Sequence, residues 1–163
     1  MSSSFSAAAF GEVSIGDAET TALFDLSDMQ PGDTQSACFV ATVTEGSAVN
    51  DWRIYSGGVT GDGLEDYINL TIRLEAVTTD GTPPGISDCS GFVTDTVPVA
   101  GTLGAYAAST STFLDGDSLG AQTTGVANSV RIWLIFQLPE TPDVWAHASG
   151  LTASTSWIVE NQT

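Results

Sequence analysis

INLTIRLEA, the stretch from Ile68 to Ala76, decides the fold class because apolar and polar residues alternate along its whole length. Successive side chains of a β-strand point to opposite faces, so this alternation predicts a strand with one buried and one solvent-facing side. The expected inward set is Ile68, Leu70, Ile72, Leu74 and Ala76. The expected outward set is Asn69, Thr71, Arg73 and Glu75.

A second stretch, SVRIWLIFQL from Ser129 to Leu138, repeats this period of two. Its outer face should carry Arg131 and Gln137, but it also carries the apolar Trp133 and Ile135. Apolar residues on both faces predict a strand that is covered on both sides. The expected inward set is Val130, Ile132, Leu134, Phe136 and Leu138.

Turn signals separate these and other strand-like runs. In LSDMQPGDTQSACFVATVTE, Leu26 to Glu45, Pro31 fixes φ and Gly32 accepts a positive φ, which predicts a tight turn. Segments such as VTGDGLED and LPETPD read as loops, and only GTLGAYAAS, Gly101 to Ser109, looks helical. The prediction is an all-β fold, a two-sheet antiparallel sandwich of jelly-roll type with about eight to ten strands and one short helix. The pattern alone does not separate a jelly roll from an immunoglobulin-like sandwich.

The charge balance excludes whole classes of partner. The 163-residue chain carries 20 acidic residues against three arginines and no lysine, a formal net charge of −17. Nucleic acid and anionic membrane surfaces are therefore not expected as partners, because both require Lys and Arg. Adaptation to salt, or codon bias, is the alternative explanation of this composition. Apolar runs stay shorter than the roughly 20 residues of a membrane span, so no membrane insertion is expected.

Cys38 and Cys89 are the two cysteines, and we predict that they form a disulfide. Cys89 sits in SDCSG, a polar turn where a lone thiol would not fill a core. The bridge would close a loop of about 50 residues, with a stabilisation of about 4 kcal/mol on a chain-entropy argument. It would also imply an oxidising compartment. The alternative is a pair of buried free thiols.

Catalytic and metal-binding motifs are weak. His147 is the only histidine, so no zinc signature or Ser-His-Asp pattern is met, and we expect no enzyme activity and no cofactor. The carboxylate pairs Glu65/Asp66 and Asp115/Asp117 do not by themselves make a glycosidase pair. Two acidic turns resemble parts of calcium loops, with ordinary turns as the alternative. The calcium candidates are Asp62, Asp66, Asp115 and Asp117.

Four tryptophans suggest carbohydrate binding as an alternative function. Aromatic rings that stack on sugars would make the chain a cell-surface carbohydrate-binding module, whereas tryptophans more often fill a core or an interface. The residues concerned are Trp52, Trp133, Trp145 and Trp157.

The N-terminal arm, residues 1–15, differs from the domain expected over residues 16–163. Ser2 to Ile15 is small and uncharged apart from Glu12, with larger apolar residues at intervals. Such a segment buries little surface alone, but it can add a strand to a neighbour's sheet. A disordered tail, or an edge strand of its own domain, is the alternative. The expected donor residues are Phe5, Phe10, Val13 and Ile15.

Over about residues 22–162 the chain resembles the TasA/camelysin family of secreted matrix proteins. The resemblance is carried, in order, by FDLSDMQPGDTQSACFVATVTEGS, VNDWRIYSGG, GLEDYINLTIRLE, DCSGFV, GTLGAYA, VRIWLIFQLP and SGLTASTSWIVENQ. It implies a jelly-roll domain, export with removal of a signal peptide, and extracellular fibres in which the N-terminal strand of one subunit completes the sheet of the next. The metallo-endopeptidase activity that the camelysin label implies is not carried over, since its ligands are missing.

Taken together, we expect an extracellular or cell-surface structural protein whose main partner is a second copy of itself, joined head to tail. Other matrix components are secondary candidates for partners. MSSSFSAAAF lacks a basic region and an apolar core, so the signal peptide would already be absent from this chain.

Overall fold

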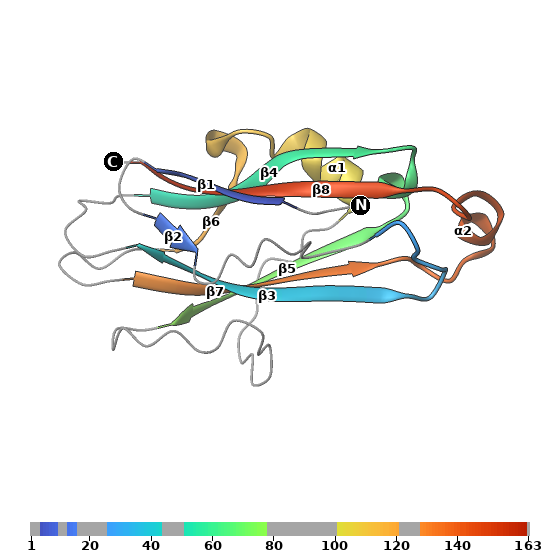
Figure 1. Ribbon diagram of the computed structural model, residues 1–163, viewed down its shortest axis with the longest axis horizontal. Helices are drawn as coiled ribbons and strands as arrows, with labels where there is room; N and C mark the ends of the chain where they lie inside the picture. The colour runs from blue at the N-terminus through green and yellow to red at the C-terminus, as the bar shows by residue number, and fades with distance from the viewer. Residues whose placement is uncertain are drawn as a thin grey trace.

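Two four-stranded sheets lie face to face as the two layers of the molecule (Figure 1). The computed structural model describes residues 4–9, 13–15, 26–43, 51–77, 101–120 and 128–162. Sheet A contains, in spatial order, β1 (Ser4–Ala9), β8 (Ala153–Gln162), β4 (Asp51–Gly61) and β6 (Asp117–Ser118). Sheet B contains, in spatial order, β2 (Val13–Ile15), β3 (Thr34–Val43), β7 (Asn128–Gln137) and β5 (Asn69–Val77).

The strand pairings are antiparallel with one exception among the described strands. β3 and β5 flank β7 in sheet B, and β4 runs antiparallel to β8 in sheet A with a bulge between Ser56 and Gly58. β1 instead runs parallel to β8. The predicted strand-rich fold of two mainly antiparallel sheets is thus confirmed, and β1 is the exception among the described strands. A local pattern shows that a strand exists and not which distant strand it joins.

The alternating stretches bury the faces that their period predicts. Ile68, Leu70 and Ile72 are at most 1% exposed, and the inward residues of β7 and Leu138 are at most 2% exposed. Trp157 of β8 lies at the centre of the core, with its ring centroid 6.5 Å from that of Phe136. The two sheets therefore share one core across the layer between them.

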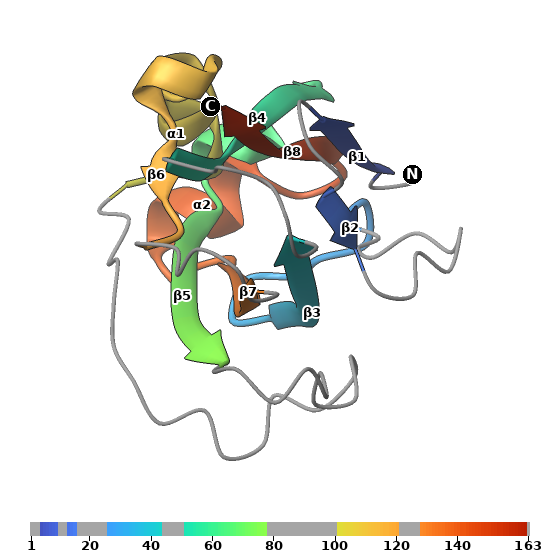
Figure 2. The same ribbon diagram turned by 90° about the vertical axis from the view of Figure 1, so that its left-hand side faces the viewer.

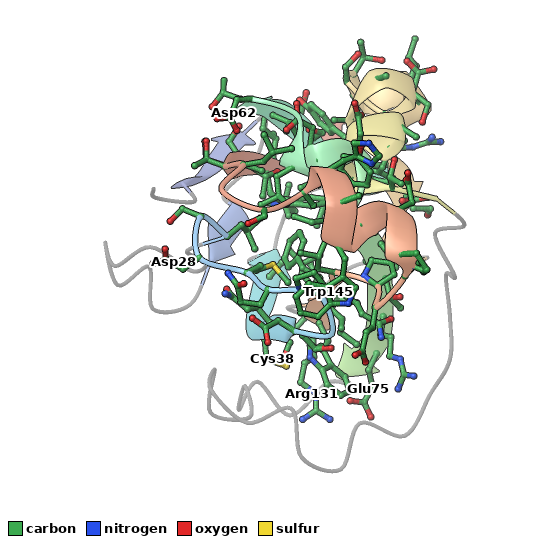
Figure 3. The ribbon with its side chains drawn as sticks, turned by 90° about the vertical axis from the view of Figure 1, so that its right-hand side faces the viewer. Asp28, Cys38, Asp62, Glu75, Arg131 and Trp145 are labelled. Atoms are coloured by element: carbon green, nitrogen blue, oxygen red, sulfur yellow. The ribbon has the colours of Figure 1, made fainter. Side chains whose placement is uncertain are left out.

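Arg131 takes the outward position that the period of two predicts. It lies on the outer face of sheet B, but it is only 9% exposed and donates hydrogen bonds to the carboxylate of Glu75 on β5. Figure 3 shows the two side chains together below sheet B. Trp133 and Ile135 on the same face are half-buried. This agrees with the prediction that both faces of β7 are covered, and Arg131 is among the residues buried on the outer face.

The predicted Pro-Gly turn is confirmed. Gly32 has φ +96°, and the Asp33 amide donates to the Gln30 carbonyl over 2.9 Å. The Asp33 carboxylate accepts from the Gln30 amide over 2.7 Å. The turn also joins the end of β7, because the Gly32 amide donates to the Leu138 carbonyl over 2.8 Å. Since that backbone needs a left-handed φ, glycine suits this position.

The described residues contain two α-helices, where one was predicted. The predicted helix is α1 (Leu103–Ser109), which begins at the N-cap Thr102 and buries Leu103 and Tyr106. The second, α2 (Pro142–His147), was not predicted, and it begins at the last two residues of LPETPD, whose first four residues form the predicted loop. Thr141 caps it and Pro142 stands at its first turn, a favoured start for a helix. The described ranges also contain two short 3-10 turns, η1 (Leu64–Asp66) and η2 (Phe113–Asp115).

None of the described helices has the length and apolarity that crossing a membrane demands. They sit around the sandwich instead of within it: α2 lies at one end of the long axis, and α1 lies beside β4 (Figures 1 and 2). The outermost strands of the two sheets run along the long sides of the sandwich.

Candidate functional site at the two sheet edges

The described N-terminal strands occupy the same side of the sandwich in both sheets (Figure 2). β1 pairs with β8 from Ser4↔Ser156 to Ala9↔Asn161. β2 pairs with β3 from Val13↔Val43 to Ile15↔Ala41. The arm therefore passes from sheet A to sheet B between Ala9 and Val13, and it closes one side of the molecule. We call this side the arm edge.

Without the arm, the arm edge would present two rows of backbone donors and acceptors. β8 pairs with β4 on its other side, and β3 pairs with β7 on its other side. Unpaired sheet edges readily accept another strand, from the same chain or from a second one. The arm edge is thus built to bind one extended segment along β8 and a shorter one along β3.

On β3 the arm covers only a part of the available length. β2 reaches Ala41 to Val43, whereas β3 extends back to Thr34. Residues Thr34 to Val40 have β7 as their one strand neighbour within the described ranges. The contact of the arm with sheet B is therefore much shorter than its contact with sheet A.

The opposite side, which we call the helix edge, is closed by residues 101–118. The Leu70 amide of β5 donates to the Gly101 carbonyl over 3.2 Å, and the Ser56 amide of β4 donates to the Thr110 carbonyl over 2.9 Å. β6 then pairs with Arg53 and Ile54 of β4. This segment, like the arm, contacts both sheets.

Side chains hold the helix edge in place. Tyr106 is 4% exposed, and its ring centroid lies 5.4 Å from that of Trp157. Its hydroxyl donates to the Asp117 carboxylate over 2.9 Å. Burial, followed by the charge of Asp117, raises the pKa of Tyr106 above its ordinary value, so the phenol stays neutral and keeps donating.

Arg53 adds a second anchor at the helix edge. Its Nη1 donates to the Leu114 and Gly116 carbonyls, each over 3.1 Å, and its guanidinium lies 5.5 Å from the centroid of the Phe113 ring. A cation above an aromatic face adds an attraction of about 0.5–1 kcal/mol at partly exposed sites. The turn around η2 is therefore tied to β4 through side chain and backbone together.

The predicted donor residues fall where the arm meets the sheets, as far as the structure describes them. Phe5 lies in β1, and Val13 and Ile15 lie in β2, whereas Phe10 lies outside the described residues. In the single chain these strands pair with its own sheets, which corresponds to the alternative of an edge strand of the same domain. Exchange between copies stays a prediction.

The calcium candidates lie apart and have partners in the fold. Asp62 accepts from the backbone amide and, over 3.0 Å, from the hydroxyl of Thr152. These hydrogen bonds lower the pKa of Asp62 below its ordinary value. Asp115 accepts from the Thr112 hydroxyl over 2.7 Å, and Asp117 accepts from Tyr106. In the part of the chain that the structure describes, no three His, Cys, Asp or Glu side chains gather around one point.

Asp66, the fourth candidate, lines a surface pocket of about 330 Å³ between η1, β4 and α1. Glu65 is its neighbour there, and Glu65 accepts from the Gly63 amide over 3.2 Å. The two carboxylates share one 3-10 turn, so they do not face each other across a cleft as glycosidase acids do. Gly104 lets α1 approach, since a Cβ there would lie 2.6 Å from Asp66 Oδ1.

Cys38 lies on β3, is 7% exposed and is disulfide-bonded. Its register partner is Trp133 of β7, which places it on the outer face of sheet B. Figure 3 shows it on that side, away from Asp62. Cys89, the other cysteine of the sequence, lies outside the described residues, so the Cys38–Cys89 pairing stays a prediction.

The tryptophans whose side chains are described have three different surroundings. Trp157 is 1% exposed in the core, and Trp133 is half-buried with the Arg73 guanidinium 5.3 Å from its ring centroid. Trp145 on α2 is 54% exposed (Figure 3). Trp52 lies in β4. A sugar-binding platform needs several exposed rings on one surface, and these three side chains do not provide one.

His147 lies in the last turn of α2, where Nδ1 is 3.0 Å from the Asp143 carboxylate. Both side chains are mostly exposed. Sequence reasoning missed the helix edge as a functional element, although the capped α1 was found. The signal lay in Tyr106, the one large aromatic residue within that helix.

The comparisons with known proteins give no relative. The chain matches no family model, and no curated protein or solved structure matches it significantly. The interpretation of its function therefore depends on the two edges themselves.

Proposed function

We propose that this chain is a secreted structural subunit that assembles into extracellular fibres by exchanging its N-terminal arm, residues 1–15, between copies. The observation that carries the proposal is that the arm edge is closed in both sheets by β1 and β2, one continuous segment near the start of the chain. A segment that pairs with its own sheets makes the same hydrogen bonds when it pairs with those of a second copy.

Head-to-tail exchange leads to a filament and not to a closed pair. Each subunit would receive an arm at its arm edge and extend its own arm to the next subunit, which is an open-ended contact. Residues 16–25 link β2 to the domain and can span at most about 35 Å when extended. This reach is enough for an arm to cross to an adjacent copy.

The charges favour the arm as the exchanging segment. Ser2 to Ile15 carries a single acidic residue, Glu12, in a chain with a formal net charge of −17. Bringing two such chains together is opposed by their mutual repulsion, which salt screens over a distance of about 10 Å at 0.1 M. A nearly neutral arm adds little to this repulsion when it enters the neighbour's edge.

The arm of the same chain competes with exchange. A tethered segment has an effective concentration in the millimolar range, so a closed monomer resists exchange at micromolar protein. We therefore expect slow assembly of the purified chain, accelerated by mild urea or heating that releases the arm and by added salt.

Jelly-roll wiring, membership in the TasA/camelysin family and a surface location after signal-peptide removal belong to the same proposal. The resemblance of the ordered sequence motifs supports them, together with a cysteine that is disulfide-bonded. The proposal assigns no enzymatic activity, no cofactor and no calcium requirement to the chain.

Electron microscopy of three samples tests the proposal. The full chain, a variant lacking residues 1–15, and the full chain with an excess of a peptide of residues 1–15 are incubated at matched salt and mild urea. We expect filaments from the first, folded monomers from the second, and short or capped filaments from the third. A peptide of the same composition in scrambled order is the control.

Filaments of the same form from the variant without residues 1–15 would overturn the proposal. So would a full chain that stays monomeric at every salt and urea concentration that preserves its circular dichroism. If the truncated chain does not fold, the capping peptide still gives the answer, since it leaves the full chain intact.

A further inference from the structure

The sequence contains two Asn-x-Thr triplets, Asn69–Thr71 and Asn161–Thr163. This triplet is the acceptor motif for N-linked glycosylation, in which the asparagine must be reachable from solvent in an exported protein. The motif is short, so its surroundings in the fold decide whether it is a site.

Asn69 has the surroundings of an acceptor. It is the first residue of β5, and its side chain is exposed while that of the next residue, Leu70, is buried. Its side-chain amide makes no hydrogen bond to the described part of the chain. Thr71, the third residue of the motif, lies on the same face of the strand and is half-buried.

The neighbours of Asn69 are polar and uncharged. Asn69 is in register with Gln137 of β7, and Gln137 is in register with Thr34 of β3. All three side chains are exposed, so they form an uncharged polar row across the outer face of sheet B. A sugar attached to Asn69 would meet hydrogen-bonding groups along this row.

Asn161 lies in a different place. It belongs to β8, where it is in register with Ala9 of β1 on one side and Trp52 of β4 on the other. Its strand lies directly beside the arm, so this second motif belongs to the arm edge. The two motifs therefore differ in their relation to the arm edge.

We propose that Asn69 is an N-glycosylation site. The inference rests on the export that the proposed function requires. The co-reactant is an oligosaccharide linked to a polyprenyl phosphate carrier, supplied by the exporting cell. The Asn69 amide nitrogen bonds to the anomeric carbon, the bond between that carbon and the phosphate oxygen breaks, and the phosphate leaves with the bonding electrons. The proton lost from the amide passes to a carboxylate of the transferase.

The position of the sugar would give the assembly a direction. β5 is the last described strand of sheet B on the helix edge, where the backbone of Asn69 bridges that of Thr102. A hydrated oligosaccharide there obstructs side-by-side pairing of two copies through this edge, much as charged residues protect edge strands. The arm edge stays free for exchange.

Trypsin separates the two motifs, because the chain has only Arg53, Arg73 and Arg131 as cleavage sites. Peptide 54–73 contains Asn69 and peptide 132–163 contains Asn161. The protein is isolated from the surface of its own cells, digested, and analysed by mass spectrometry with fragmentation that keeps the sugar on its residue. We expect a series of sugar masses on peptide 54–73, assigned to Asn69.

Matched variants distinguish the effect of losing the glycosylation motif from the effect of losing the fold. Asn69→Gln and Thr71→Ala should both abolish the modified form of peptide 54–73, whereas Thr71→Ser keeps the motif and should retain it. Asn161→Gln should leave the sugar on peptide 54–73. Circular dichroism of each variant checks that loss of the sugar is not loss of the fold.

Surface protein whose peptide 54–73 is entirely unmodified would overturn this inference alone. Protein found only inside the cell and without sugar would overturn both this inference and the proposed function. Modified protein that never forms arm-dependent filaments would overturn the proposed function and leave the glycosylation site standing.

Discussion

The arm edge and the helix edge are both open sides of the sandwich, and they are covered by different kinds of chain segment. Each is an open side of a two-sheet sandwich, and each is closed by one chain segment that contacts both sheets. The segment at the helix edge, residues 101–118, lies in the middle of the chain and drives Tyr106 into the core beside Trp157. The segment at the arm edge lies at the start of the chain and pairs strand to strand.

This difference determines which edge can open. Removing Tyr106 from the core exposes apolar surface, which costs about 25 cal/mol per Å². Both ends of residues 101–118 are also held by the chain, so that segment cannot move to another molecule without unfolding its own. The arm is joined to the domain through residues 16–25, and its backbone hydrogen bonds each contribute about 1 kcal/mol. We therefore propose the arm edge as the side at which copies exchange.

The largest expected effect is at the helix edge. Tyr106→Ala should lower the free energy of unfolding by about 3–5 kcal/mol, because it leaves a cavity beside Trp157 and removes the donor to Asp117. Urea unfolding followed by circular dichroism measures it. A loss below about 1 kcal/mol would show that this edge is not anchored through the core.

Tyr106→Phe is the matched variant for the hydroxyl. It keeps the ring against Trp157 and removes only the hydrogen bond to Asp117, so we expect a loss of about 1 kcal/mol. Neither variant should change the form of the filaments, since Tyr106 lies at the helix edge, on the side of the sandwich opposite the arm edge.

At the arm edge the expected effect is on assembly more than on folding. Successive N–H groups of a strand point to opposite sides, so only one of Ala7 and Ala8 directs its N–H toward β8. A proline at that position removes the same ladder bond of about 1 kcal/mol from the closed monomer and from the filament, so the concentration needed for filaments should stay nearly unchanged, whereas the arm should leave the closed monomer roughly fivefold more readily. Light scattering against time, which follows the rate of assembly, measures it.

The other proline variant of this pair is the control, because an edge strand tolerates proline where the N–H faces solvent. Equal effects of Ala7→Pro and Ala8→Pro on assembly would contradict paired exchange of β1. The urea midpoint of both variants should stay close to that of the parent chain.

The smallest effect is expected at Asp62, which ties the end of β4 to the start of β8 through Thr152. Hydrogen bonds lower the pKa of this carboxyl, so its contribution to stability is present above the unfolded pKa near 3.9. That contribution is lost as the pH falls through the lowered pKa of the folded state. The Tm of the parent should therefore fall more steeply below pH 4 than that of Asp62→Asn.

Glu140→Gln controls for the removal of an exposed carboxylate. The informative quantity is the difference in Tm between parent and variant as a function of pH, since the other carboxyls titrate in both. A difference for Asp62→Asn that is constant from pH 6 to pH 2.5 would exclude the proposed role of Thr152.

Sequence reasoning worked where the signal was local. The alternation in Ile68–Ala76 and Ser129–Leu138 identified buried residues such as Ile72 and Leu134, because a period of two depends on neighbours in the chain alone. The Pro31–Gly32 turn and the short helix within Gly101–Ser109 are equally local signals, and both are present.

What the sequence left open mostly concerns relations between distant residues. The outer face of β7 was predicted to be covered, but its own strand could not reveal that Arg131 pairs there with Glu75. The parallel pairing of β1 with β8 joins the two ends of the chain, which no pattern within either strand specifies. For the same reason the sequence suggested an exchangeable arm, but it did not indicate that the arm would contact both sheets.

Cross-linking between β1 and β8 in filaments tests the central claim most directly. Ser4 and Ser156 are in register and lie on different tryptic peptides, 1–53 and 132–163. The Ser4→Cys/Ser156→Cys variant is prepared in light and heavy nitrogen, mixed in equal amounts, assembled, joined with a short bis-maleimide and analysed by mass spectrometry. Exchange predicts linked pairs of one light and one heavy peptide at the frequency of random pairing in filaments, and same-isotope pairs in monomers. Filaments that contain only same-isotope pairs would contradict it.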